Sequence, residues 1–306
     1  MQTQRTFIDD LKHQYKHGGM AIRLIFINVA IFLIIRILDV FLGLGGMLPG
    51  TFISDFVTPV FGLHTTLDSF ITNPWALFTN MFAHYDFLHL LFNMVFLYFA
   101  GRMFEQLFSN KRLLYTYLLG GLFGGILEIL AHTILPKMGI FNSVVIGASG
   151  SITAIFVAIA FYRPNLKVNL FGILPVRIII LAGLYILKDL LSLGQDDNIA
   201  HFAHLGGAIL GMISIQNLHS SGNIVNRAQQ FGDWIVSLFS GNRKPRMKVK
   251  RGKQQASQRP MTDEEYNAIK KTKQDQIDRI LDKISKSGYE SLTKKEKDFL
   301  FNQSKK

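Results

Sequence analysis

A serine between small residues is the first group in this chain that could do chemistry. Gly147, Ala148, Ser149 and Gly150 precede an apolar run, residues 152–161, that predicts a helix. The amides that open a helix favour negative charge, and glycine admits close approach by other chain segments. Ser149 could therefore attack a carbonyl while backbone N–H groups stabilise the oxyanion. The alternative is a small-residue face at which membrane helices pack.

A second stretch, residues 201–211, carries a candidate base. His204, Gly207 and Gly211 follow one another at spacings of three and four, so one helix face holds an imidazole and two glycines. If this face packs on the helix that Ser149 opens, His204 can serve as its general base. The alternative is a packing face whose histidine bonds a nearby carbonyl.

A third group of polar residues stands at the start of another apolar segment. His89 and Asn93 are four apart and share a helix face, whereas His84 is five residues before His89 and need not share it. Polar groups at membrane depth are costly and point to function by default. Hydrogen bonding between helices is the alternative.

The elements that must position these residues are apolar blocks. The 306 residues are 49% hydrophobic and include no cysteine, and blocks of roughly 20 apolar residues suffice to cross a bilayer as helices. We predict an all-α polytopic membrane protein, a bundle of six transmembrane helices with a short soluble helical tail. The predicted spans are residues 24–44, 87–104, 113–135, 149–162, 176–193 and 201–215.

Composition divides the chain into four parts. We expect a cytoplasmic N-terminal segment at 1–20, a six-span catalytic domain at 21–217, a basic cytoplasmic linker at 218–260 and a small helical segment at 261–306. Thr262 and Thr293 each precede a glutamate by three residues, a capping-box pattern, and Gly288 is placed to end a helix. The linker suits anionic lipid rather than nucleic acid.

The distribution of Lys and Arg predicts the orientation in the membrane. Of these residues the presumed outer loops hold only Lys137, beside acidic residues that include Asp196 and Asp197. The positive-inside rule then places both termini in the cytoplasm. Ser149, His204, His89 and His84 should consequently lie at one depth, near the outer surface.

Together these motifs resemble the rhomboid family of intramembrane serine proteases, and bacterial members in particular. The resemblance covers roughly residues 20–217, including a Gly101-Arg102-x-x-Glu105 ending of the second span. It implies an endopeptidase of a bacterial inner membrane that cleaves transmembrane segments of other membrane proteins, without metal or cofactor. The implied roles are nucleophile for Ser149, base for His204 in a dyad without an acid, oxyanion donors for His89, Asn93 and the Ser149 amide, and support for His84, Gly147, Gly150 and Gly207.

The chain departs from the family pattern at several positions. Thr153 replaces an aromatic residue whose ring packs on the catalytic histidine, Ala76 replaces the arginine of a Trp-Arg pair, and His201 has no assigned role. Three other readings stay open: a metal protein, an inactive rhomboid-like binder and a transporter. The first would use His84, His89, His201 and His204, but no clear acidic ligand completes that set.

Overall fold

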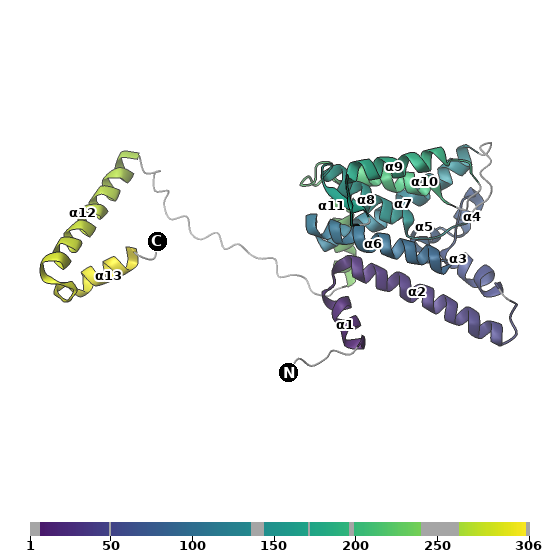
Figure 1. Cartoon of the computed structure of the whole chain (residues 1–306), viewed down its shortest axis with the longest axis horizontal. Helices are drawn as coiled ribbons and strands as arrows, with labels where there is room; N and C mark the ends of the chain where they lie inside the picture. Colours follow the sequence, from purple (N-terminus) through teal and green to yellow (C-terminus); the bar gives the residue numbers. More distant parts are fainter. Residues whose placement is uncertain are drawn as a thin grey trace. The chain divides into compact units, whose positions relative to one another are not determined.

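The computed structural model describes residues 7–48, 50–135, 144–170, 172–195, 199–239 and 263–303. The chain divides into two compact units, Met1–Asn242 and Arg243–Lys306 (Figure 1). Several features used in the predictions lie outside the described residues. These are residues 240–260 of the predicted basic linker, Thr262, and the loop residues Lys137, Asp196 and Asp197.

Each predicted span corresponds to a helix of the first unit. Three helices are long and apolar enough to cross a membrane: α2 (Gly19–Leu44), α6 (Phe87–Leu107) and α7 (Asn110–Ile134). The other three have 14 residues each: α8 (Ser149–Tyr162), α9 (Ile178–Leu191) and α10 (His201–Ser214). Such helices are about 21 Å long, less than the ~30 Å of a hydrocarbon core. The protein is therefore a helical integral membrane protein, and the count of six spans stays a prediction.

Helix α8 lies at the centre of this unit, in contact with α6, α7, α9 and α10 (Figure 1). Glycines on α7 allow the close packing, because a Cβ at Gly120 would lie 2.5 Å from Ala154 Cβ and one at Gly124 would lie 2.7 Å from the Ala203 carbonyl. Large apolar side chains such as Phe92 and Phe99 remain exposed on α6. The apolar outer faces suit contact with lipid, and the small-residue faces hold the bundle together.

The long loop between α2 and α6 has a structure of its own. Its elements are η1 (Ile53–Val57), α3 (Thr58–Phe61), β1 (Leu63–His64), α4 (Leu67–Thr72), α5 (Ala76–Thr79) and η2 (Asn80–Phe82). Strand β1 pairs antiparallel with β2 (Val144–Val145), close before Ser149. Trp75 Nε1 also donates to the Pro59 carbonyl at 3.2 Å. The loop is thus tied to the chain beside Ser149 without an arginine at position 76.

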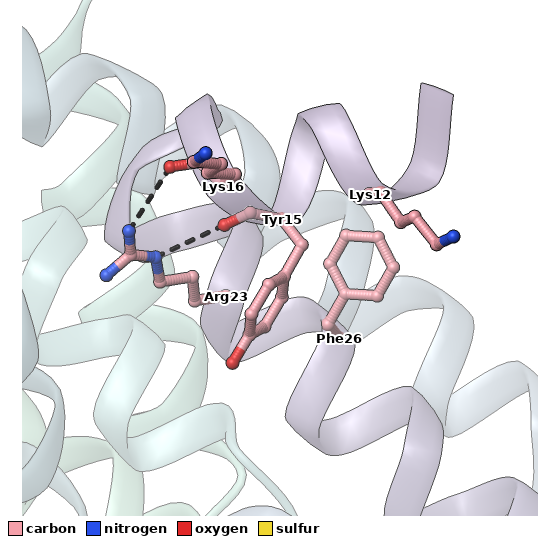
Figure 2. A pocket seen from close by; sticks show the side chains of 5 residues that line it. All are labelled: Lys12, Tyr15, Lys16, Arg23 and Phe26. Atoms are coloured by element: carbon pink, nitrogen blue, oxygen red, sulfur yellow. Dashed lines mark hydrogen bonds between the residues drawn. The ribbon is translucent and has the colours of Figure 1, made fainter. Parts of the chain in front are cut away.

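The start of α2 is held by the end of α6 and by the N-terminal helix. Glu105 accepts a 2.9 Å hydrogen bond from the Ala21 N–H, and Arg102 donates to the Gly18 carbonyl at 3.3 Å. Between α1 (Phe7–His17) and α2, a pocket of about 620 Å³ is lined by Lys12, Tyr15, Lys16, Arg23 and Phe26. Figure 2 shows Arg23 donating to the Tyr15 and Lys16 carbonyls, which ties the two helices together.

Part of the predicted linker belongs to the first unit. Helix α11 (Ile224–Phe239) packs on α7. The guanidinium of buried Arg112 explains this contact, because it donates to the Ser214 carbonyl, to Asn223 Oδ1 at 3.1 Å and to Asn226 Oδ1 at 2.9 Å. A charge removed from water needs such partners. Between α8 and α9 a hairpin of β3 (Lys167–Leu170) and β4 (Leu174–Arg177) was not predicted.

The second unit contains α12 (Asp263–Ser287), η4 (Tyr289–Ser291) and α13 (Lys294–Gln303). Gly288, with φ of 74°, follows α12 at the predicted stop. At α13 the predicted capping box is present, since Glu296 accepts from the Thr293 N–H at 2.7 Å and Thr293 Oγ1 accepts from the Glu296 N–H at 3.4 Å. Bonds from Thr293, and then from Lys283, lower the pKa of Glu296 to about 2.

Candidate active site

Ser149 is the first residue of α8, and the turn before it contacts the start of α6. Gly147 has φ of 125°, and a Cβ there would lie 2.7 Å from His89 Cε1. Both the backbone conformation and the space therefore require glycine. The Gly147 N–H donates to the Asn80 carbonyl at 2.9 Å, so the loop fixes this turn from the other side.

His84 supports the same turn. The Ala148 N–H donates to His84 Nε2 at 3.4 Å, and the rings of His84 and His89 meet edge to face with centroids 5.0 Å apart. Burial, and to a smaller extent the neighbouring His89, lower the pKa of His84 to about 3. The imidazole is thus neutral near pH 7, as it must be to accept the Ala148 N–H.

Helices α8 and α10 touch backbone to backbone beside Ser149. A Cβ at Gly150 would lie 3.1 Å from the Ala203 carbonyl oxygen, and one at Gly207 would lie 2.1 Å from the Gly150 carbonyl oxygen. Farther along, Gly211 meets the Ala154 carbonyl in the same way. The glycine face of residues 204–211 therefore packs on α8, and the contacting residues Gly150 and Ala203 are the chain neighbours of Ser149 and His204.

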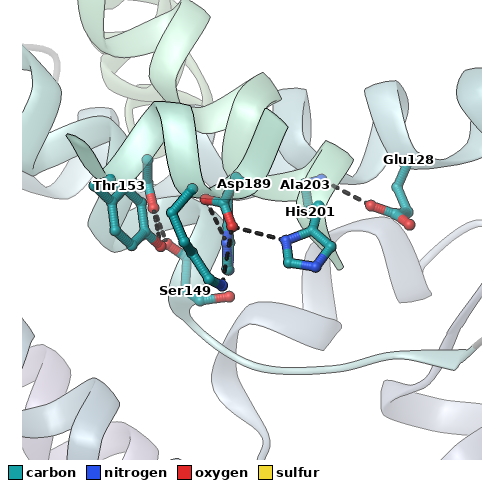
Figure 3. A network of polar contacts seen from close by, with 9 residues as sticks. Glu128, Ser149, Thr153, Asp189, His201 and Ala203 are labelled. Carbon is teal, nitrogen blue, oxygen red and sulfur yellow. Dashed lines mark hydrogen bonds and ion pairs between the residues drawn. The ribbon is translucent and has the colours of Figure 1, made fainter. Parts of the chain in front are cut away.

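A buried carboxylate that the sequence reading passed over contacts His204. Asp189 of α9 lies with Oδ2 3.0 Å from His204 Nδ1 and with Oδ1 2.7 Å from His201 Nδ1. Figure 3 shows Asp189 beside His201 within the polar network around Ser149. A signal was available, because an acidic residue inside an apolar segment points to function by default. The contact to His201 also gives that residue a structural partner.

An aromatic ring does pack on His204, but it comes from α9. Tyr185 and His204 have ring centroids 5.7 Å apart at an interplanar angle of 34°. Thr153, the residue that replaces the expected aromatic, lies with Oγ1 3.3 Å from the Tyr185 hydroxyl and donates to the Ser149 carbonyl at 2.8 Å (Figure 3). The smaller side chain leaves room for the tyrosine of the neighbouring helix.

The two predicted oxyanion donors lie at the start of α6. Asp86 caps this helix by accepting from the His89 N–H at 2.7 Å. Asn93 Nδ2 donates to the His89 carbonyl at 2.9 Å. An amide group has a second N–H, so Asn93 retains one donor for another acceptor. Gly147 against His89 places this helix start beside the Ser149 turn.

The start of α10 is fixed from α7. Buried Glu128 accepts a 2.7 Å hydrogen bond from the Ala203 N–H (Figure 3). The first N–H groups of a helix have no partner within the helix, so this carboxylate acts as a cap. It holds the residue next to His204 and is a structural group.

The histidines considered as metal ligands fall into two pairs. His84 and His89 contact each other, while His201 and His204 share Asp189. Within the described residues, the group with metal-like spacing is Asp189, His201 and His204, whose ligand atoms lie within 4.8 Å of one another. The two short contacts from nitrogen to carboxylate already satisfy these groups as hydrogen bonds.

Two family models match the chain. Residues 72–220 match the rhomboid domain family, and residues 261–306 match a family of unknown function, DUF6576. RHOMBOID-like protein 12, mitochondrial, of Arabidopsis thaliana is 33% identical over 150 residues, which cover 45% of each chain. Rhomboid-like protease 3 of Toxoplasma gondii is 30% identical over 138 residues, 45% of this chain and 49% of that protein.

A zebrafish relative, Presenilin-associated rhomboid-like protein A, mitochondrial, is 28% identical over 137 residues, 43% of this chain and 34% of that protein. The chain thus spans about half the length, or less, of the curated relatives it matches. These relatives are eukaryotic and do not support the bacterial source that the sequence led us to expect. The motif resemblance agrees with the family match, in which residues 72–220 of this membrane protein are similar to the rhomboid domain.

Proposed function

We propose that this protein is an intramembrane serine endopeptidase that cleaves transmembrane segments of membrane-protein substrates. The observation that carries the proposal is the contact of α8 with α10, where Gly150 packs on Ala203 and Gly207 packs on Gly150. Gly150 follows Ser149 in the chain and Ala203 precedes His204, so this contact supports the pairing of two residues that 55 positions separate in the sequence. A nucleophile beside its base is the arrangement that acyl transfer requires.

In the proposed reaction His204 takes the proton of the Ser149 hydroxyl as Ser149 attacks the scissile carbonyl. The oxyanion is held by the Ser149 amide, His89 and Asn93. His204 then protonates the leaving amine, and water attacks the acyl-enzyme and releases the second product. The substrate helix must first unwind so that its carbonyl is free, which small or helix-breaking residues near the outer surface would favour.

The proposal includes six spans with both termini in the cytoplasm, supported by the basic residues of the inner segments. Reporter fusions after residue 140 should then report a position on the outer side of the membrane, and fusions after residue 220 a position in the cytoplasm. The opposite result would move the site to the inner surface. Localisation of the tagged chain in cells identifies the membrane in which the protein resides.

The direct test uses purified protein with a single-span substrate in the same detergent. Wild type should cleave, and Ser149→Ala and His204→Ala should each abolish cleavage while remaining folded. Because the two residues act as a unit, the double variant should be no worse than either single one. Ser151→Ala is the matched control, since Ser151 is a buried serine two residues along the same helix.

The same samples separate the protease from its rivals. A serine-reactive fluorophosphonate should label wild type and Ser151→Ala but not Ser149→Ala. A folded wild type that neither cleaves nor labels would favour the inactive rhomboid-like binder. Cleavage that persists in Ser149→Ala and stops with a chelator would favour metal chemistry at Asp189, His201 and His204.

A further inference from the structure

Helix α9 carries two side chains that face His204 and that no motif marks. Asp189 and Tyr185 are four residues apart, so they share one face of the helix. Asp189 is buried and accepts a hydrogen bond from each of two imidazoles. Its Oδ2 accepts from His204, and its Oδ1 accepts from His201. Tyr185 lies with its ring against His204. The His204 ring is therefore held at Nδ1 by the carboxylate and on one face by the tyrosine ring.

The hydrogen bond to Asp189 selects one tautomer of the neutral His204 ring. A carboxylate can only accept, so the proton of the neutral ring resides on Nδ1 and the lone pair resides on Nε2. A general base toward Ser149 needs that lone pair. The second bond, from His201, satisfies the other oxygen at 2.7 Å, and Lys188 Nζ lies 3.5 Å from the same oxygen. The carboxylate is thus fixed before the substrate arrives.

We propose that Asp189 is the positioning residue for His204, and that the Tyr185 ring completes this support. The proposal rests on the proposed function, and it replaces the expected dyad without an acid by a serine, a histidine and a carboxylate from three helices, α8, α10 and α9. Asp189 acts through His204 and has no contact with substrate. Thr153 contacts both the Tyr185 hydroxyl and the Ser149 carbonyl, and it fixes the position of the ring relative to the start of α8.

The test compares kcat and KM of wild type, Asp189→Asn and Ser149→Ala in one detergent. The asparagine keeps the shape but presents an amide N–H where one imidazole N–H now binds. We expect kcat to fall by about 10²-fold or more, the low end of what a positioned general base contributes. KM should stay within about twofold, because the substitution leaves the contacts that bind the substrate in its ground state unchanged. Fluorophosphonate labelling of Ser149, which needs no substrate, should slow in parallel.

Asp39→Asn is the matched control, since Asp39 is also an aspartate of a membrane helix, 3.7 Å from Arg36. It should keep the wild-type kcat. An equal fall in both variants, or a wild-type kcat in Asp189→Asn, would overturn the positioning role and leave the protease standing. Wild-type cleavage that does not depend on Ser149 would overturn both. Loss of wild-type activity in chelator would instead assign Asp189, His201 and His204 to a metal ion.

A second pair of variants decides the matter if Asp189→Asn does not fold. Tyr185→Leu removes the ring from His204, whereas Tyr185→Phe retains it and loses the hydroxyl contact to Thr153. We expect kcat to fall more in Tyr185→Leu than in Tyr185→Phe, with KM unchanged in both. The same kcat in the two folded variants would show that α9 does not position His204.

Discussion

Asn93 illustrates how one residue can serve both its helix and a reaction. One N–H of its amide bonds the His89 carbonyl at 2.9 Å, and the other is the donor proposed for the oxyanion. The bond within the helix holds the side chain in place before the reaction. Preorganised donors of this kind are effective because they need not reorient when charge develops.

We therefore expect Asn93→Ala and His89→Ala each to lower kcat by up to ~10²–10³-fold, the cost of one oxyanion donor. Asn28→Ala is the control, because Asn28 is a buried asparagine that makes the same bond within its helix, to the Leu24 carbonyl at 2.9 Å. It should reduce thermal stability but not the kcat of the folded protein. Wild-type turnover in both test variants would remove these residues from the mechanism.

His84 predicts a dependence of stability on pH. Its folded-state pKa, about 3, lies below the ordinary value of 6.5. The unfolded chain therefore binds more protons between these values, and stability should fall as pH drops from 6.5 toward 3. His84→Gln has no charge to gain and should lose less. Unfolding temperatures of both proteins at pH 7.5 and pH 4.5 would show this, and equal losses would contradict it.

At the scale of elements, the site depends on helices that approach more closely than side chains normally allow. Gly207 on α10 meets the Gly150 carbonyl, so any Cβ there must push α8 and α10 apart. Backbone on both sides of the contact leaves little room for relaxation. The separation would act directly on Ser149 and His204, which flank it.

Gly207→Ala should therefore lower both stability, by about 1–3 kcal/mol as for overpacked cores, and cleavage. Gly183→Ala on α9 is the matched control, because a Cβ there meets nothing within 4 Å. Helix propensity alone would make that variant more stable by up to ~1 kcal/mol. Thermal unfolding and cleavage rates measure both effects. Similar behaviour of the two variants would mean that the backbone contact is not tight.

For the whole molecule, the boundary of the first unit falls after α11 rather than at the last predicted span. Asn223 and Asn226 bind Arg112 of α7, and Lys111 pairs with Asp233 at 2.5 Å. Nothing in the described part of residues 243–306 resembles a catalytic cluster. The second unit has its own capping box and its own ion pair between Lys283 and Glu296, 3.0 Å apart.

A chain ending at residue 242 should thus cleave in detergent at a rate within about twofold of wild type, as expected for removal of a separate unit. A chain ending at residue 220 loses Asn223 and Asn226, and hydrogen bonds to a charged group contribute about 1.5–3 kcal/mol each. It should be less stable. Cleavage and unfolding temperature test both chains, and an inactive but folded 1–242 chain would give the tail a role in catalysis.

The sequence by itself determined the apolar segments, the small-residue faces and the motifs around Ser149, His204, His89 and Asn93. These features are local, because helix periodicity and spacing within one helix can be read from neighbouring positions. The same holds for the capping box at Thr293 and the helix stop at Gly288.

Only the tertiary structure placed Asp189 on His204, Tyr185 in the space beside Thr153, and α11 on Arg112. Each of these contacts joins different helices, and the sequence within one helix does not say which partner its face will meet. Motifs within single helices therefore indicated the proposed nucleophile, Ser149, and the proposed base, His204. The residues that hold the base were set by packing between helices, where close contact and the need of buried polar groups for partners decide the arrangement.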